Sequence, residues 1–398
     1  MRYRFDRFVL DAARRELHDG DMPVALEPQV FDLLEFLICH RERVVTRDEL
    51  IAGVWGGRIV SESTLATRIN AARKAIGDDG AAQRLIKTIA RKGFRFVGAV
   101  SEDGDASPVP PSAAGAPLPE QAITFARARD GVTVAVSVAG EGPVLLKTAN
   151  WLNHLEYDWH SPVWSPMFAR LVRRFRFVRY DGRGNGLGDR AAKDISFDGF
   201  ERDLAAVVDL LALKDFAMLG LSQGAATAIA YAVRHPGQVS RLILYGAYAK
   251  GRNRRGSPED MAQAQTVLAM MRQGWGNEES AFMRAFSSLY LPNGTREQIK
   301  WFADMQRLST SGEMAARLRV ACDDIDISDL LPQVRVPTLV LHARHDNVVP
   351  LEQGRQIAAQ IPGARFLTLE SENHVPVPGE PAWERLMQEI ESFAAGGV

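Results

Sequence analysis

One segment of the sequence divides the chain and limits what it can fold into. Residues 101–119 read SEDGDASPVPPSAAGAPLP, with five prolines in nineteen positions and no periodic apolar pattern. Such a segment cannot bury enough apolar surface to order itself, so we expect a semi-extended linker over residues 101–120. The 398 residues are then predicted to form two domains, residues 1–100 and residues 121–398.

Charge is unevenly divided between these two domains. Residues 1–100 contain 17 lysines and arginines and 14 aspartates and glutamates, which gives this part a net charge of +3. The whole chain has a net charge of −1. Between Ser61 and Arg95 there are 8 basic and 3 acidic residues. A basic segment of this kind is typical of a surface that faces nucleic-acid phosphates, although a solvated basic face has the same composition.

Cysteine content and the apolar runs bear on the compartment. Cys39 and Cys322 have no partner nearby in the sequence, which favours a reducing compartment and argues against a disulfide or zinc framework. The start, MRYRFDRF, lacks the apolar core of a signal peptide, and no run approaches the roughly 18 apolar residues of a membrane span. We therefore expect a soluble, cytoplasmic protein with no membrane partner, no cofactor and no metal.

Short extended pieces and three helices are predicted in the first domain. Pro28 stands at a tolerated first-turn position of the first helix, and Thr46-Arg-Asp-Glu49 forms a capping box that opens the second. The third helix is expected over about residues 61–76. Beyond it, residues 85–89 and 94–97 have the pattern of a tight β-hairpin.

Two faces of the third predicted helix differ in character. Leu65, Ile69, Ala72 and Ile76 share one face, and Ser63, Thr67, Asn70 and Lys74 lie opposite, flanked by Arg68 and Arg73. Short polar groups can reach base edges and guanidinium groups can reach phosphates, so this face suits the DNA major groove. A solvated amphipathic helix would have a similar pattern.

Three blocks in the first domain follow one another in a familiar order: LEPQVFDLLEFLICHRERVVTRDELI, VSESTLATRINAARKAIGD and IKTIARKGFRFVG. Residues 1–100 thereby resemble the OmpR/PhoB-type winged-helix output domain. The resemblance implies an α+β winged helix-turn-helix that binds double-stranded DNA, with a homodimer on repeated half-sites. It places Thr67, Arg68, Asn70, Arg73 and Lys74 at the major groove, and Arg91 and Lys92 of the wing near the backbone or minor groove. No receiver domain precedes this one, so we expect the signal to enter from the carboxyl-terminal side.

Beyond the linker, apolar runs alternate with helical segments. An antiparallel ribbon, residues 123–126 and 132–138, is followed by strand–helix alternation, which predicts an α/β domain with a mainly parallel sheet. Only helical patterns appear at about 250–331. We expect that block to form a helical cap over one end of the sheet.

The motif GLSQG lies at a predicted strand–helix turn. The apolar run 216–219 precedes Gly220, and small residues follow Gly224. A nucleophile elbow needs glycine on both sides of its serine because the tight turn leaves no room for Cβ atoms. Ser222 is therefore the candidate nucleophile.

A serine nucleophile needs a base, and the base needs an acid to orient it. Asp346 lies in HARHDNVVP just past one predicted strand, and His374 lies in ESENHVPV after the next. Parallel strands bring their carboxyl ends to one edge of the sheet. The order Ser222, Asp346, His374 predicts a catalytic triad.

The glycine-rich run YDGRGNGLGD, residues 180–189, lacks the Gly-Lys-Ser/Thr ending of a phosphate-binding loop and matches instead the D-x-R-G-x-G turn of α/β-hydrolases. With GLSQG and ANWLNHLEYDW, it makes residues from about 121 to 395 resemble the α/β-hydrolase superfamily. Where many relatives have His-Gly, this chain has KTANW. The resemblance then implies an oxyanion hole made by the backbone N–H groups of Gln223 and of Asn150 or Trp151.

Together the two resemblances indicate a one-component transcription regulator. Its hydrolase-like domain would sense a small ester-, lactone- or ketone-like ligand. Met and aromatic residues in the predicted cap favour an apolar one. The alternative is an esterase-like serine hydrolase with an accessory DNA-binding domain. The sequence also allows a pure receptor that does not turn its ligand over.

Overall fold

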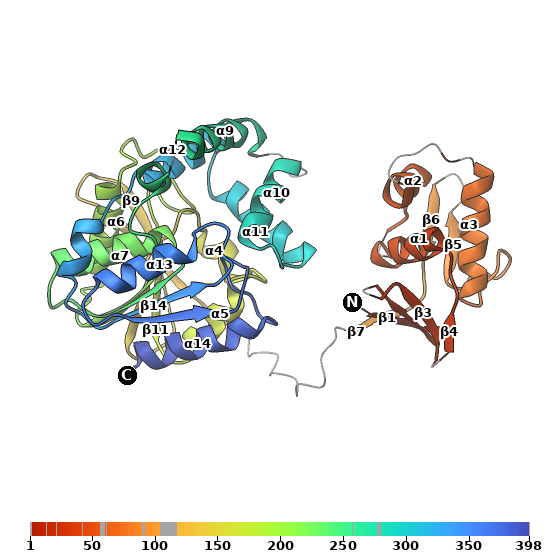
Figure 1. The fold of residues 1–398 in the computed structure, drawn as a ribbon, viewed down its shortest axis with the longest axis horizontal. Helices are drawn as coiled ribbons and strands as arrows, with labels where there is room; N and C mark the ends of the chain where they lie inside the picture. The colour runs from red at the N-terminus through yellow and green to blue at the C-terminus, as the bar shows by residue number, and fades with distance from the viewer. Residues whose placement is uncertain are drawn as a thin grey trace. The chain divides into compact units, whose positions relative to one another are not determined.

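The computed structural model describes residues 2–12, 14–20, 22–41, 43–55, 60, 62–89, 92–103, 118–256, 258–276 and 280–397. Two compact units make up the chain, Met1–Ala114 and Gly115–Val398 (Figure 1). Most of the predicted linker, residues 104–117, lies outside the described residues, as do Ser61 and Arg91.

The first unit combines an antiparallel sheet, three helices and a hairpin (Figure 1). Its five-stranded sheet has the order β4-β3-β2-β1-β7. These strands are β1 (Arg2–Phe5), β2 (Phe8–Asp11), β3 (Glu16–Asp19), β4 (Met22–Val24) and β7 (Val100–Asp103). The helices are α1 (Pro28–Cys39), α2 (Arg47–Trp55) and α3 (Glu62–Ala75), and the hairpin pairs β5 (Ile86–Ile89) with β6 (Gly93–Phe96). The predicted helices and hairpin are confirmed.

Local signals in the sequence position these helices. Glu27 is the N-cap of α1, and Pro28 occupies its first turn. At α2 the capping box forms in both directions, since Glu49 N donates to Thr46 Oγ1 at 3.2 Å and Thr46 N donates to Glu49 Oε2 at 2.8 Å. The apolar face of α3, including Ile69, then packs into the core of the unit.

Strand β7 differs from the sequence prediction. We expected the linker to begin at residue 101, but Val100–Asp103 pairs antiparallel with β1, and Ser101 lies opposite Arg4. The segment is polar and has no alternating pattern, so only its distant partner makes it a strand. Strand β3 was also missed, since the extended pieces predicted from the sequence were residues 3–5, 8–10 and 24–26.

The second unit contains an eight-stranded sheet with the order β15-β14-β13-β12-β10-β11-β9-β8. Its strands are β8 (Ala122–Arg127), β9 (Thr133–Ala139), β10 (Val144–Lys147), β11 (Arg176–Asp181), β12 (Phe216–Leu221), β13 (Val239–Tyr245), β14 (Thr338–Ala343) and β15 (Arg365–Leu369). From β11 to β15 every pairing is parallel, while β9 runs antiparallel to both β11 and β8. The predicted α/β class with an opening antiparallel ribbon is confirmed.

Helices cover both faces of this sheet. One core contains residues of α6 (Phe197–Leu210), α7 (Gln223–Arg234) and α13 (Leu351–Gln360), and the other contains residues of α4 (Leu155–Trp159), α5 (Ser165–Leu171) and α14 (Pro381–Ala394). Successive residues of β12 alternate between them: Phe216 and Met218 belong to the first core, and Ala217 and Leu219 to the second. A strand buried on both faces explains its continuous apolar run.

Helices fill the chain between β13 and β14. They are α8 (Arg252–Arg255), α9 (Pro258–Gly274), α10 (Ala281–Tyr290), α11 (Arg296–Ser309) and α12 (Gly312–Asp323), followed by the 3-10 helix η1 (Ser328–Gln333). The described part of this stretch contains no strand. We refer to α8–α12 as the cap.

Candidate functional site

Ser222 occupies a tight turn between β12 and α7. It has φ 52° and ψ −123°, a conformation that L-residues rarely adopt. A Cβ at Gly220 would lie 2.5 Å from Ala225 Cα, and one at Gly224 would lie 2.6 Å from Ala149 O. Both flanking glycines are therefore required by the packing around the turn.

Asp346 and His374 meet beyond the carboxyl ends of β14 and β15. Nδ1 of His374 lies 2.6 Å from Asp346 Oδ2, and Asp346 Oδ1 accepts hydrogen bonds from Val348 N at 2.8 Å and Val349 N at 3.0 Å. Burial alone would raise the pKa of the Asp346 carboxyl, but the charge and hydrogen bond of His374 and the Val349 N–H outweigh it and lower the pKa. The ionised carboxylate thus favours the proton on Nδ1 and leaves Nε2 of His374 as a base.

The loop that carries His374 is attached to the cap. The backbone N–H groups of His374 and Val375 both donate to Tyr290 O, at 2.9 and 3.3 Å, and Tyr290 is the last residue of α10. Beside them, Asn293 N donates to Asn373 Oδ1 at 3.0 Å. The position of His374 therefore depends on the cap.

One pocket is lined by Ser222, His374 and Gln223, together with Asn150 and Trp151. In the described part of the chain no hydrogen bond joins Ser222 to His374. Gln223 is the first residue of α7, where a backbone N–H has no partner within the helix. The structure thus brings Ser222, His374 and the residues of the predicted oxyanion hole to one cavity, while Asp346 contacts His374 and is not part of the lining.

The loop after β10 is tied to the serine turn. Thr148 Oγ1 donates to Gly224 O at 2.9 Å. The side chain of Asn150 is used within its own loop, since it accepts from Lys147 Nζ at 2.6 Å and donates to Leu152 O at 3.1 Å. The backbone N–H of Asn150 is the predicted donor to a ligand oxygen.

Buried charged side chains lie beside this loop. Burial lowers the pKa of Lys147 to about 8, and Asp158 and Arg179 contribute opposing electrostatic effects. The ammonium group also lies 5.6 Å from the centre of the Trp164 ring. Lys147 and Asn150 together therefore fix a loop whose sequence departs from the common His-Gly.

Charged cap residues in the pocket were not predicted from the sequence, where only the Met and aromatic residues of the cap pointed to a pocket. Phe302 and Met305 of the cap line the pocket, whereas Met270 is exposed. The charged residues of the lining are Arg252, Arg255, Arg319 and Asp323. The run RNRR at residues 252–255 was the available signal, but only the fold shows which of its arginines face the cavity.

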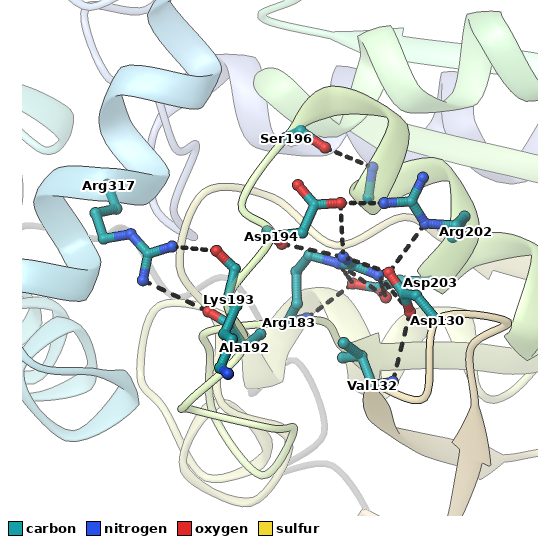
Figure 2. A network of polar contacts seen from close by, with 11 residues as sticks. Asp130, Val132, Arg183, Ala192, Lys193, Asp194, Ser196, Arg202, Asp203 and Arg317 are labelled. Atoms are coloured by element: carbon teal, nitrogen blue, oxygen red, sulfur yellow. Dashed lines mark hydrogen bonds and ion pairs between the residues drawn. The ribbon is translucent and has the colours of Figure 1, made fainter.

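The glycine-rich loop after β11 has a structural role through Arg183, whose side chain is fully buried (Figure 2). Its guanidinium pairs with Asp203 at 2.8 Å and with Asp130 at 2.9 Å. Figure 2 also shows Arg317 of α12 directed at the backbone oxygens of Ala192 and Lys193, both of which accept hydrogen bonds from it. The network connects the β8–β9 turn, α6 and the cap.

The predicted DNA-facing residues separate into two groups in the structure. Thr67, Asn70 and Lys74 are exposed on α3, and Lys92 is exposed beside β6. Arg68 is half-buried and forms an ion pair with Glu27. Arg91 lies outside the described residues.

The structure corrects the prediction that Arg73 faces the DNA major groove. Its side chain is buried, with 5% exposure, and its guanidinium donates to Ile86 O at 2.9 Å and Thr88 Oγ1 at 2.8 Å. The long arginine side chain reaches from the edge of α3 to β5, where it satisfies a strand carbonyl. Arg73 therefore holds the hairpin against α3.

Within the described ranges, no group of three histidine, cysteine or acidic side chains could hold a metal ion. None of the helices described is long and apolar enough to span a bilayer.

Two family models match the chain. One, described as alpha/beta hydrolase fold, matches residues 152–381, and the other, described as transcriptional regulatory protein, C terminal, matches residues 21–96. The first match covers more than half of the chain. The second identifies the first unit as a DNA-binding domain of the OmpR/PhoB type.

Curated relatives match the hydrolase part. AB hydrolase superfamily protein YisY of Bacillus subtilis is 27% identical over 253 residues, which are 63% of this chain and 91% of that protein. A pimeloyl-(acyl-carrier protein) methyl ester esterase of Nitrosomonas europaea is 24% identical over 249 residues, 61% of this chain and 93% of that enzyme.

Solved structures agree on the fold. An esterase from Exiguobacterium antarcticum has a TM-score of 0.57 and 23% identity, and it covers 69% of this chain and 99% of its own. The enol-lactonase from Burkholderia xenovorans LB400 has a TM-score of 0.54 and 23% identity, with 68% and 100% covered. At these identities the similarity concerns the fold.

Proposed function

The chain belongs to the alpha/beta hydrolase fold family, and from this premise we propose that it is a DNA-binding transcription regulator whose hydrolase unit senses, and cleaves at Ser222, a small ester- or lactone-like ligand. The observation that carries the proposal is the presence, in one chain, of an OmpR/PhoB-type domain and a pocket containing Ser222 and the Asp346–His374 pair. That an esterase and an enol-lactonase share the fold supports an acyl bond as the target. A homodimer on repeated half-sites remains part of the proposal.

The proposed chemistry is acyl transfer to Ser222. His374 Nε2 takes the proton of the Ser222 hydroxyl as Oγ attacks the acyl carbon, and the imidazolium is stabilised by Asp346. Backbone N–H groups of Gln223 and of Asn150 or Trp151 would donate to the oxyanion. His374 returns the proton to the leaving alkoxide, and water then releases the acid by the same steps in reverse.

Reaction of Ser222 with a fluorophosphonate tests the catalytic part. We expect stoichiometric labelling of the full chain and none of the Ser222→Ala variant. The His374→Ala variant should label at least ~100-fold more slowly, because the base is lost. Absence of labelling in the wild type would contradict turnover at Ser222.

A DNA-binding measurement separates regulator from hydrolase. The full chain is incubated with fragmented genomic DNA, and the fragments that it retains are sequenced. The affinity of the protein for these fragments is then compared before and after fluorophosphonate labelling. The control is the Ser222→Ala variant treated with the same reagent. A regulator should change its affinity by at least ~3-fold when the pocket is occupied. If DNA is bound with unchanged affinity while esters are hydrolysed, the second candidate, a hydrolase with an accessory DNA-binding domain, is favoured.

A further inference from the structure

We propose that the cap contributes an anion subsite to the pocket over Ser222, formed by Arg255 and Arg319, and that the ligand is a small ester bearing a carboxylate. The inference deepens the proposed function and rests on it, since it concerns the same pocket. It also revises the expectation of a purely apolar ligand.

The charges of the pocket lining are predominantly positive. Among the described residues, Arg252, Arg255 and Arg319 line it with one acidic residue, Asp323. Asp323 Oδ2 accepts from Arg319 Nε at 2.8 Å, so this carboxylate is already engaged by one arginine. An anion entering this cavity would therefore meet excess positive charge in a place shielded from water.

Arg255 has a buried donor for which a ligand could supply the acceptor. Its Nη1 atom is buried and has no hydrogen-bond partner among the described residues. The guanidinium lies 5.7 Å from the centre of the Tyr248 ring, and burial lowers the pKa of Arg255. A buried cationic donor without an acceptor is costly, and a bound carboxylate would satisfy it.

Arg319 is a largely buried, charged residue whose neighbours fix its position. Its side chain is only 13% exposed, and its guanidinium lies 5.9 Å from the centre of the Trp151 ring. Burial would lower the pKa of Arg319, but the neighbouring Tyr290 and Asp323 outweigh this and raise it, so the group remains charged. Asp323 uses Nε, which leaves the other donors of the planar fork for two ligand oxygens.

Neutral groups of the lining complement the arginines. Trp151 Nε1 is a second buried donor without a partner, and Gln306 Oε1 is a buried acceptor without one among the described residues. Gln306 Nε2 is already used by Ser287 Oγ at 2.9 Å and Phe302 O at 3.1 Å. The unmet hydrogen bonds therefore fit a ligand that is rich in acceptors and carries one donor.

A carboxylate fits better than a phosphate. Moving a dianion such as phosphate from water into a largely apolar cavity costs more desolvation free energy than moving a monoanion, and Asp323 adds a repulsion that also grows with the ligand's charge. Aromatic walls such as Tyr248 and Phe302 suit a short hydrocarbon segment between the carboxylate and the ester.

Two esters of the same shape test the subsite with the full chain. Mono-4-nitrophenyl glutarate carries a carboxylate where 4-nitrophenyl pentanoate carries a methyl group. We expect kcat/KM for the glutarate to exceed that for the pentanoate about tenfold or more, as a charge-assisted pair allows. Arg255→Met should lower this ratio at least tenfold, whereas Arg254→Met should not change it, because Arg254 is exposed on the same helix and does not line the pocket.

Binding provides a readout that does not depend on turnover. In the Ser222→Ala variant, calorimetry should give tighter binding of mono-4-nitrophenyl glutarate than of the pentanoate, and the additional Arg255→Met change should remove the difference. If neither ester is hydrolysed but this difference persists, the catalytic proposal fails and the subsite stands. A wild-type ratio near one with equal binding, or stronger competition by inorganic phosphate than by acetate, would overturn the assignment. Arg319→Lys, which keeps the charge beside Asp323, provides a second variant should Arg255→Met fold poorly, and we expect it to lower the ratio as well.

Discussion

Ser222 shows how a single residue can be held in a strained backbone conformation. Its φ of 52° is unfavourable for any residue with a Cβ, and conformations of this kind cost about 1–3 kcal/mol. The hydrogen bond from Ser222 N to Tyr245 O at 2.8 Å helps to keep the turn in place. The free energy of unfolding should therefore respond to the Cβ at this position independently of the hydroxyl.

A pair of variants separates the two effects. Ser222→Gly removes both hydroxyl and strain, whereas Ser222→Ala removes the hydroxyl and keeps the Cβ. We expect Ser222→Gly to be more stable than Ser222→Ala by about 1 kcal/mol, because relief of strain exceeds the entropic penalty of glycine. Urea unfolding followed by tryptophan fluorescence measures the difference. Equal midpoints and slopes would contradict the strain.

At the scale of single residues the sequence had clear limits. Ser222, Asp346 and His374 could be proposed as a triad because each stands in a distinctive local pattern at the end of a predicted strand. Arg73 and Arg255 were not. Whether a long arginine turns toward solvent, a strand carbonyl or a cavity depends on which element packs beside it, and local spacing does not contain that information.

Elements were predicted well where they carry their own signals. The capping box at Thr46 and the apolar runs of the parallel strands depend only on neighbouring residues or on full burial. Strand β7 depends on β1, nearly the whole first unit away in sequence, and its polar residues form an edge of the sheet. Edge strands of this kind have weak patterns because one side faces solvent.

Arg183 contacts several elements, so its replacement should lower the stability of the hydrolase unit as a whole. Replacement by methionine would leave the buried Asp203 carboxylate without its ion-pair partner. We expect Arg183→Met to lower the free energy of unfolding by about 3–5 kcal/mol. The matched control is Arg202→Met, whose side chain is 33% exposed and pairs with the same Asp130, and it should cost at most about 1 kcal/mol. Similar losses for both variants, measured by urea unfolding, would refute a special role for Arg183.

The same network gives a pH dependence with a definite sign. Burial alone would raise the pKa of Asp130, but hydrogen bonds and ion pairs with Arg183 outweigh it and lower the pKa to about 2. Because the folded value lies below the unfolded one, Asp130 stabilises the fold above about pH 4, and this contribution is lost as the pH falls toward 2. We expect Asp130→Asn to remove about 1.5 kcal/mol of the stability difference between pH 5 and pH 2.5.

Urea unfolding at the two pH values checks this expectation. Asp198→Asn is the control, since Asp198 is 73% exposed and lies 3.9 Å from its partner Arg234. An acid-induced loss of stability that is the same in wild type and Asp130→Asn would count against the assignment.

For the whole molecule, DNA binding should depend on α3 of the first unit. Lys74 is exposed on that helix, so Lys74→Ala should weaken binding and lower the slope of log affinity against log salt concentration by about 1. Lys214→Ala makes the same charge change on the exposed surface of the hydrolase unit and should leave the slope unchanged. Fluorescence anisotropy over a salt series, with a DNA fragment retained by the wild type, measures both. Equal slopes for Lys74→Ala and wild type would exclude a phosphate contact.

The division into a DNA-binding unit and a hydrolase unit was readable from the sequence, because each has motifs in a fixed order. The chemistry of the pocket was not, since its lining is assembled from segments as distant as residues 150 and 376. Ligand preference is a property of the assembled cavity.

The attachment of His374 to Tyr290 bears on how such a protein can change its specificity. The backbone of His374, the proposed base, is hydrogen-bonded to the last residue of α10. The cap is therefore not an independent module that recombination can exchange. A chimaera carrying a foreign cap would have to reproduce the carbonyl at Tyr290 and the contact at Asn293, or lose its base. New ligands are therefore more accessible through point changes at positions such as Arg255 than through replacement of the cap.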